Sequence, residues 1–212
     1  MRITDIHKNQ PIYVIGGGSS LSGFDFSKLD GKITLACNSA AFQFPAKYLV
    51  FLDDQFYREN TEKVNQFTGI KITLDYPSIN LSNIIKVKLW KGEEEQKELV
   101  GTSRLTALGI TEKEEDGIST GGNSGFLALS LAYIMGGNPI YLLGIDMQFT
   151  SNIKYFYEHD ISRRGMESEY KHMLQAFNYA APILESRGVK VCNCSKDSKL
   201  EGYEYFSLDD IK

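Results

Sequence analysis

Glycine, hydroxyl, amide and carboxyl residues follow apolar runs at several widely separated points of this 212-residue sequence. Glycine allows close approach to the backbone, amides donate and accept hydrogen bonds, and carboxylates bind metal ions or hydroxyl groups. The residues concerned are Gly16, Gly17, Gly18, Ser19, Ser20, Asn38, Asp53, Asn123, Ser124, Gly125 and Asp146. Together these residue types are suited to holding a phosphate, a ribose or a sugar.

The glycine-rich stretch GGGSSLSG (16–23) ends the apolar run PIYVI. Bare backbone N–H groups followed by a helix N-terminus favour an anion. The stretch is not a strict G-x-G-x-x-G fingerprint, and no Gly-Lys-Ser/Thr follows it as in a P-loop. Two interpretations therefore stay open, a nucleotide site that a ligand approaches closely and a tight strand-to-helix turn.

The polar strand ends also have two interpretations each. Asn38 could read a base or a ribose, or it could cap the following segment. Asp53 and Asp54 could bind Mg²⁺ or ribose hydroxyls, or they could cap a helix over 55–67. For Asp146, which ends an apolar run, we favour the orientation of a loop through backbone N–H bonds over direct catalysis.

Two histidines and two tyrosines lie in the segment after that run. His159 or His172 could serve as a general base toward a sugar hydroxyl, because histidine titrates near neutral pH. Tyr155 and Tyr157 could stabilise a phosphate without a metal. The alternatives are surface or structural histidines and tyrosines that pack the loop.

The hydrophobic pattern predicts alternating strands and helices. Strands are expected at 11–17, 32–38, 47–53, 70–76, 83–90, 140–146 and 189–195, and helices at 55–67, 124–135 and 166–188, with a kink or break at Pro182. Continuously apolar strands between helices predict an α/β, Rossmann-like, mostly parallel sheet with helices on both faces. We expect one domain, 1–212, in which the charged stretch 91–117 is a solvated excursion, a flap or lid with solvent-facing acidic runs.

Composition narrows the partners. The net charge of −4 and the pI near 5.5 argue against a broad basic surface, so no nucleic acid is expected. No apolar stretch reaches the roughly 18 residues of a membrane span, and the first ten residues show no signal-peptide core. Three cysteines, Cys37, Cys192 and Cys194, predict small core residues in a reducing cytoplasm instead of a disulfide framework or a metal site.

The order of these motifs resembles a known group of proteins. The motifs are GGGSSL, CNSA and FLDD after three strands, then NSGFLALSLAYIMGGNPIYLLGID, a His-bearing helix and VKVCNCS. In order and spacing they resemble the bacterial sialyltransferases of the Campylobacter type, the related motility accessory factor proteins and the archaeal 6-hydroxymethylpterin pyrophosphokinase-like domain. The resemblance covers most of the chain except 91–117.

The resemblance implies a donor site. Residues 16–20 match the sialyltransferase loop that contacts the CMP part of the donor, with Gly17 where an asparagine would stand. Asn38 matches a donor-binding asparagine, and Asp53 stands where a second asparagine is found. Residues 123–125 match a Thr-Ser-Gly loop of the same site.

The resemblance also implies catalytic residues. Residues 144–146 match the Gly-Ile-Asp of those enzymes, and Tyr155 falls near the tyrosines that hold the donor phosphate. Their base histidine begins the helix before the last strand, which corresponds to His172. The alignment of the intervening loop leaves His159 open as the alternative base.

From the residues and the resemblance together we predict a nucleotide-sugar-dependent, sialyltransferase-like glycosyltransferase. It would use a CMP-sugar-like donor, a glycan or other hydroxyl acceptor and a histidine base, with no metal required and a homo-oligomer left open. One alternative is an ATP- and Mg²⁺-dependent pyrophosphokinase-like enzyme acting through Asp53, Asp54 or Asp146. The other is a non-catalytic module that binds a nucleotide or a glycan.

Overall fold

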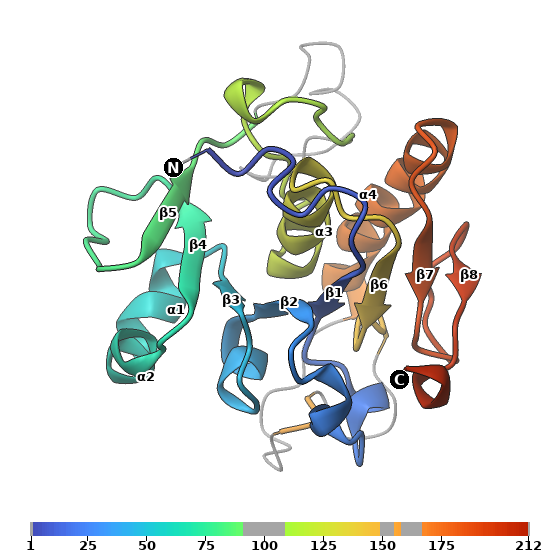
Figure 1. Cartoon of the computed structure of the whole chain (residues 1–212), viewed down its shortest axis with the longest axis horizontal. Coiled ribbons are helices and arrows are strands. Elements are labelled where there is room, and N and C mark those ends of the chain that lie inside the picture. The colour runs from blue at the N-terminus through green and yellow to red at the C-terminus, as the bar shows by residue number, and fades with distance from the viewer. Residues whose placement is uncertain (1, 91–108, 149–154, 158–166, 212) are drawn as a thin grey trace.

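The chain forms an open eight-stranded sheet with helices packed on it (Figure 1). The computed structural model describes residues 2–90, 109–148, 155–157 and 167–211. The strands are β1 (Ile12–Ile15), β2 (Ile33–Cys37), β3 (Tyr48–Val50), β4 (Ile70–Leu74), β5 (Ile84–Val87), β6 (Ile140–Leu143), β7 (Val191–Asn193) and β8 (Glu204–Tyr205). Their order is β5-β4-β3-β2-β1-β6-β7-β8, and each pairing is parallel. The predicted α/β fold is confirmed.

Four strands of mostly apolar sequence are buried on both faces. Every residue of β1, β2, β3 and β7 is buried. Such strands suit a parallel sheet that helices cover on both sides. Two hydrophobic clusters, one on each side of the sheet, account for the core.

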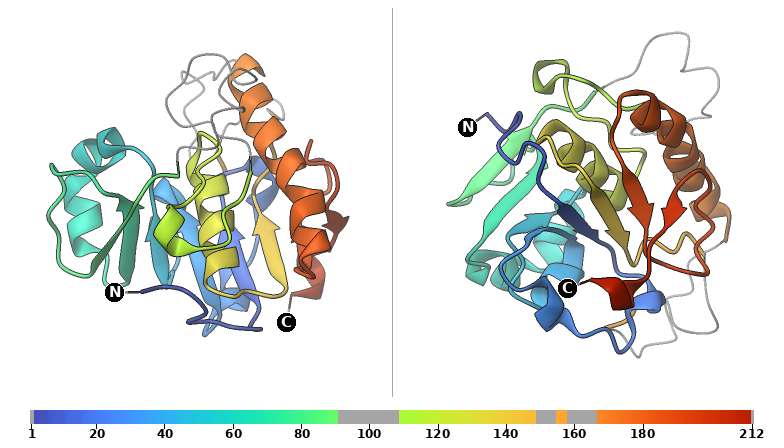
Figure 2. Two further views of the ribbon diagram at one scale, coloured as in Figure 1. Left: turned by 90° about the horizontal axis from the view of Figure 1, so that it is seen from above. Right: turned by 45° about the vertical axis from the view of Figure 1, so that its right-hand side comes forward.

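Helices cover both faces, as predicted, but the two layers differ. The α-helices are α1 (Asp54–Glu59), α2 (Thr61–Gln66), α3 (Ser124–Ile134) and α4 (Glu167–Ser186), and the short 3₁₀ turns are η1 (Ser19–Leu21), η2 (Phe26–Leu29), η3 (Asn38–Phe42), η5 (Glu114–Asp116) and η6 (Leu208–Asp210). Helices α3 and α4 lie next to each other on one face (Figure 2). The other face is covered mainly by the short elements η1, η2, η3 and α2.

Three elements differ from their predicted form. The helix expected over 55–67 is two helices that meet at Asn60, whose Nδ2 donates to the carbonyl of Phe56 at 3.0 Å. Helix α4 continues through Pro182 without a break, since proline removes one backbone donor while the buried side chains around it keep packing on the core. Strand β8 was not predicted.

The stretch predicted as a solvated flap is described only from residue 109 onward. Its first part, 91–108, lies outside the described residues. In the remainder Ile110 is buried, and the Glu114 carboxylate accepts hydrogen bonds from the backbone N–H groups of Ile3 and Thr4 at 2.9 and 3.1 Å. Glu114 is half-buried because its carboxylate binds these amide groups, whereas its neighbours Glu115 and Asp116 are exposed, as expected for the acidic run.

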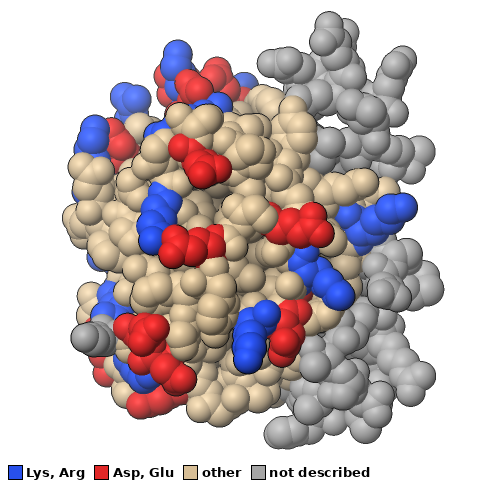
Figure 3. Space-filling model, turned by 90° about the vertical axis from the view of Figure 1, so that its right-hand side faces the viewer, with Lys and Arg blue, Asp and Glu red and all other residues tan. Residues whose placement is uncertain are grey.

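The distribution of surface charge and the character of the helices can be compared with the expected partners. Basic and acidic side chains are interspersed on the face over β7, β8 and α4 (Figure 3), so this face offers no broad basic patch. Among the described residues, no helix has the length and apolar character needed to cross a bilayer. Cys37, Cys192 and Cys194 are buried and free.

Candidate functional site

The site lies where the order of the strands in the sheet reverses, at β1 between β2 and β6. Strand β1 pairs with β2 on one side and with β6 on the other, so the loops leaving β1 and β6 diverge at their carboxyl ends. Ligands of open parallel sheets bind in the crevice at such a switch point. A cavity of about 370 Å³ lies here, which is the size of a small-molecule site.

Most of the predicted site residues line this cavity. They are Gly16, Gly17, Gly18, Asn38, Asp53, Asn123, Ser124, Gly125, Asp146, Tyr155 and Tyr157. These residues come from six separate segments of the sequence, between residues 16 and 157. The strand-end pattern therefore located the cavity correctly.

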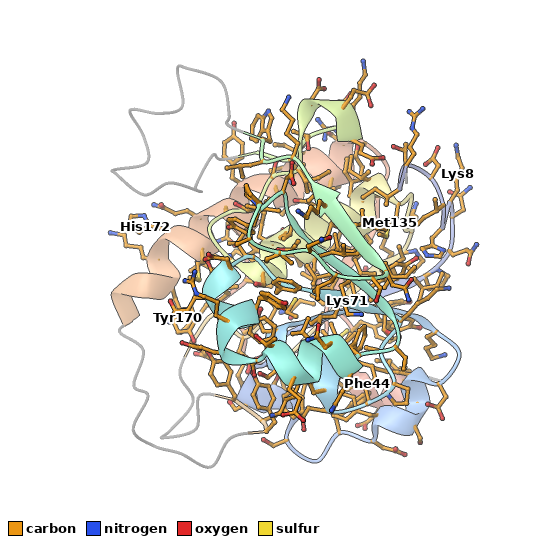
Figure 4. The ribbon with its side chains drawn as sticks, turned by 90° about the vertical axis from the view of Figure 1, so that its left-hand side faces the viewer. Lys8, Phe44, Lys71, Met135, Tyr170 and His172 are labelled. Carbon is orange, nitrogen blue, oxygen red and sulfur yellow. The ribbon has the colours of Figure 1, made fainter. Side chains whose placement is uncertain are left out.

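Three predicted residues, Ser19, Ser20 and His172, are placed differently. Ser19 and Ser20 begin η1 and do not line the cavity. His172 is exposed on α4, whereas Tyr170 and Met173 of the same helix line the cavity. Tyr170 and His172 project from different sides of α4 (Figure 4). His159 lies outside the described residues.

The three glycines are required by close packing against the protein itself. A Cβ on Gly16 would lie 2.4 Å from the Gly144 carbonyl oxygen, and one on Gly18 would lie 2.4 Å from the Asp146 carboxylate. A Cβ on Gly17 would lie 2.8 Å from the Tyr155 ring. None of the three glycines has a positive φ. The glycines thus accommodate neighbouring chain segments, which neither of the two sequence interpretations had proposed.

Asp146 holds the glycine loop in place. Its carboxylate accepts hydrogen bonds from the backbone N–H and the hydroxyl of Ser20 at 2.9 and 2.6 Å. The Ser20 hydroxyl also lies 2.9 Å from Ser195 Oγ, at the end of β7. The predicted role of Asp146 as an acceptor of backbone N–H bonds is confirmed. Ser195 was not predicted, although its place at the end of the predicted strand 189–195 was the available signal.

Asn38 is oriented by a chain of hydrogen bonds. The backbone N–H of Leu52 donates to Ser124 Oγ at 3.1 Å, and Ser124 Oγ in turn donates to Asn38 Oδ1 at 3.2 Å. Asn38 adopts a φ of 51°, a left-handed conformation that asparagine tolerates better than most residues. Asn38 thus lines the cavity with its Oδ1 held in this network.

The N-terminus of α3 reaches the same cavity. Asn123 is its N-cap residue, with Oδ1 accepting from the Phe126 N–H at 2.8 Å and Nδ2 donating to the Gly121 carbonyl at 3.2 Å. This residue therefore shapes the helix start through its side chain. The partial positive charge of the helix N-terminus favours an anion in the cavity.

The α1 side of the cavity carries acidic groups. Asp53 is the N-cap residue of α1 but makes no side-chain cap bond. Although Asp53 keeps contact with solvent, burial raises its pKa, and repulsion by Asp54 raises it further. Glu59 also lines the cavity, and its carboxylate accepts a hydrogen bond from Gln55 at 2.7 Å.

Some lining residues escaped the sequence analysis. Phe56, Glu59 and Asn60 come from one side of α1, and Tyr170 and Met173 from one side of α4. Their spacings of three and four residues were the signal, since such residues share a helix face. Within the described part of the chain, no three His, Cys, Asp or Glu side chains form a group that could hold a metal ion.

Comparisons with known proteins show which solved structures share this fold. No protein-family model matches the sequence, and no curated protein matches it significantly. Among solved structures, MAf glycosyltransferase from Magnetospirillum magneticum AMB-1 has a TM-score of 0.63 at 13% identity, covering 99% of this chain and 36% of that chain. The present chain thus spans about a third of the MAf protein.

Two further solved structures are complexes of one enzyme. The sialyltransferase CstII from Campylobacter jejuni with CMP-3FNeuAc has a TM-score of 0.52 at 16% identity, covering 93% of this chain and 86% of that chain. CST-II with a trisaccharide acceptor and CMP has a TM-score of 0.52 at 15% identity, with the same coverage. The pyrophosphokinase part of the resemblance finds no support in these structures. The chain therefore shares its fold with the MAf and CstII glycosyltransferases.

Proposed function

We propose that this chain is a glycosyltransferase that binds a nucleotide-sugar donor in the cavity at the switch point between β1 and β6. The observation that carries the proposal is the set of groups around that cavity. A helix N-terminus, two tyrosines, an oriented amide and a carboxylate surround one space. The chain shares its fold with an enzyme whose structures contain CMP or a CMP-sugar analogue.

The charges of the cavity support one orientation of the donor. The α3 N-terminus and the hydroxyls of Tyr155 and Tyr157 suit a phosphate and can stabilise a leaving phosphate without a metal. On the α1 side of the cavity, the carboxylates of Asp53 and Glu59 can accept hydrogen bonds and would repel anions. We therefore propose that the phosphate lies toward α3 and the tyrosines, and that hydroxyl or amino groups of the donor lie toward α1.

The sialyltransferase-like donor belongs to the same proposal. Within the described residues, the lining side chains include Asp53, Glu59 and Asp146 and no lysine or arginine. We propose a CMP-sugar donor whose hydroxyl and amino groups would meet these carboxylates. The three free, buried cysteines further support a reducing compartment such as the cytoplasm.

A histidine general base is the remaining element of the proposal. His172, or alternatively His159, would deprotonate the acceptor hydroxyl, a glycan hydroxyl in the simplest case. The exposed position of His172 on α4 places it outside the cavity lining, where an acceptor arriving from solvent could meet it. His172→Ala and His159→Ala should be assayed separately, because the base contributes roughly 10²- to 10⁴-fold to the rate.

The first experiment compares the thermal stability of the chain with CMP, CDP, UDP, GDP, ADP and ATP, each with and without Mg²⁺. At about 100 times Kd, a nucleotide stabilises the fold by about 2.7 kcal/mol, a Tm rise of roughly 5 to 10 °C. We expect this rise with CMP and no dependence on the metal. A rise restricted to ATP with Mg²⁺ would contradict the proposal and favour pyrophosphoryl transfer.

Turnover separates an enzyme from a binding module. With a CMP-sugar donor, wild-type protein should release CMP, and release should fall in one of the two histidine variants. Gln175→Ala is the matched control for His172→Ala, because Gln175 is also exposed on α4. Binding of CMP with no release of CMP from any donor would favour a non-catalytic module.

A further inference from the structure

Residues 155–157 form a short strap over the glycine loop, drawn in Figure 1 between two grey traces. The backbone N–H of Phe156 donates to the Gly17 carbonyl at 3.0 Å, and Tyr155 forms an isolated antiparallel bridge with Gly18. A Cβ on Gly17 would lie 2.8 Å from a Tyr155 ring atom and 3.1 Å from the Tyr157 hydroxyl. The strap therefore lies directly against the bare backbone of Gly17.

Two of the three side chains of the strap line the cavity, and the third, Phe156, meets the Tyr157 ring edge-on with centroids 4.9 Å apart. The rings of Tyr155 and Tyr157 are stacked, with centroids 5.3 Å apart and planes 3° apart, and both residues line the cavity. The ring of Phe156, which lies between them in sequence, does not line the cavity. It packs against Phe26, with centroids 5.3 Å apart.

Phe26 belongs to a cluster of phenylalanine rings beside the glycine loop, which we call the phenyl cluster. Its members are Phe24, Phe26, Phe44 and Phe156. Phe26 stacks on Phe44 at 4.9 Å and meets Phe24 edge-on at 5.1 Å. Such aromatic contacts stabilise a definite ring geometry beyond the burial of apolar surface. The Phe156 ring is thus held by packing against the other rings of the cluster.

We propose that Phe156 is a positioning residue that holds the Tyr155–Tyr157 pair in the cavity through the phenyl cluster. The inference rests on the proposed function, in which these tyrosines contact the donor phosphate. The antiparallel bridge, with its hydrogen bond from the Phe156 N–H to the Gly17 carbonyl, fixes where the strap crosses the glycine loop. The Phe156 ring fixes the orientation of the Tyr155 and Tyr157 side chains. Without that ring, the tyrosine hydroxyls lose their orientation while the rest of the cavity keeps its shape.

The experiment compares Phe156→Ala with Phe24→Ala. Phe24 is the matched control, because its ring also packs on Phe26 but makes no ring contact with Phe156. Wild-type protein and both variants are titrated with CMP. Loss of oriented hydrogen bonds to a charged group should weaken CMP binding about tenfold in Phe156→Ala. Phe24→Ala should stay within about twofold of wild type, and Phe156→Leu should restore most of the affinity.

A double-mutant cycle distinguishes positioning from general destabilisation. Tyr157→Phe should weaken CMP binding in wild type and in Phe24→Ala to the same extent. In the Phe156→Ala background it should have little further effect, because the hydroxyl is already misplaced. Equal effects of Tyr157→Phe in all three backgrounds would overturn the proposal.

Near-UV circular dichroism tests the inference independently of the proposed function. The stacked Tyr155–Tyr157 pair contributes to the tyrosine band, and this contribution should be lost in Phe156→Ala, retained in Phe24→Ala and restored in Phe156→Leu. An unchanged band in Phe156→Ala would overturn the positioning role. If wild type binds no CMP while the band changes as expected, the proposed function fails and the positioning role stands.

Discussion

The two sides of the cavity use their polar groups in different ways. On the glycine-loop side, the Asp146 carboxylate is bonded to Ser20. The glycines there pack so closely on neighbouring segments that a Cβ on any of them would lie within 3 Å of another atom. On the α1 side, Asp53 makes no hydrogen bond within the described residues, and its pKa is raised by burial and by Asp54. Packing and internal hydrogen bonds determine the conformation of the glycine-loop side. On the α1 side, the Asp53 carboxylate can still accept hydrogen bonds from a ligand.

This difference assigns separate tasks to the two sides. A group that is already bonded to the protein positions others, because a ligand would have to displace its partners. A carboxylate with a raised pKa and no partner is a candidate for ligand contact. We therefore expect substitutions on the glycine-loop side to lower stability and those on the α1 side to change ligand binding. Four substitutions test this division.

The largest effect is expected from Gly16→Ala. Its Cβ would lie 2.4 Å from the backbone oxygen of Gly144, which cannot move without disturbing β6. We expect a loss of about 3 kcal/mol in the free energy of unfolding, measured by urea denaturation. Gly125→Ala is the graded control, since its Cβ meets only side-chain atoms, at 3.0 Å. Equal losses in both variants would refute the packing explanation.

Asp146→Asn should have the next largest effect. Each of the two Ser20 donors bonds a different carboxylate oxygen, so the amide keeps an acceptor for one donor and places an NH₂ group against the other. We expect a loss of about 2 kcal/mol in the free energy of unfolding, because hydrogen bonds to a charged acceptor are lost. Ser195→Ala removes a single hydroxyl contact and should cost about 1 kcal/mol. An Asp146→Asn variant that is as stable as wild type would show that the carboxylate does not hold the loop.

Asn38→Asp tests the oriented amide. The new side chain can still accept from Ser124, and aspartate tolerates a positive φ, so stability should change by less than about 0.5 kcal/mol. The Nδ2 donor is replaced by an anionic acceptor, so CMP affinity should fall about tenfold in isothermal titration. Unchanged CMP affinity would mean that Asn38 serves only the network with Ser124 and Leu52.

Asp53→Asn should have the smallest effect on stability and the opposite sign. Because the folded-state pKa of Asp53 is raised, the folded chain favours the protonated form, so the carboxylate destabilises the fold at neutral pH. Its replacement should raise Tm on the order of 1 °C at about pH 7. The gain should shrink as pH falls through the folded pKa and vanish below the ordinary aspartate value. A gain that persists in acid would have another cause.

The sheet was predictable because its strands are continuously apolar and end in polar or glycine residues. The same signal located the cavity, since the carboxyl ends of parallel strands meet at one edge. Strand β8 carries no such signal, because Glu204 and Tyr205 are exposed and the strand is two residues long. Strands could therefore be predicted from the sequence where they are buried, because burial there favours apolar residues.

Features that depend on packing between distant segments could not be predicted. The glycines at 16–18 are explained by Gly144, Tyr155 and Asp146, and sequence patterns do not reveal which residue packs across such distances. Likewise, the rotation of α4 about its axis decides that Tyr170 lines the cavity and His172 does not. Predicting either feature requires knowing how the elements are placed relative to one another, and not only that they form.

The pairing of β1 with β6 has a consequence for how the chain folds. In this pairing Ile12 lies opposite Ile140, so its formation closes a loop of more than half the chain. Contacts of such high sequence separation slow folding, because loop-closure entropy opposes them until the sheet is nearly complete. The cavity forms at this pairing. A partly folded chain that contains β1 to β5 would therefore have its own sheet but no ligand site, and a ligand could act only after the last large closure.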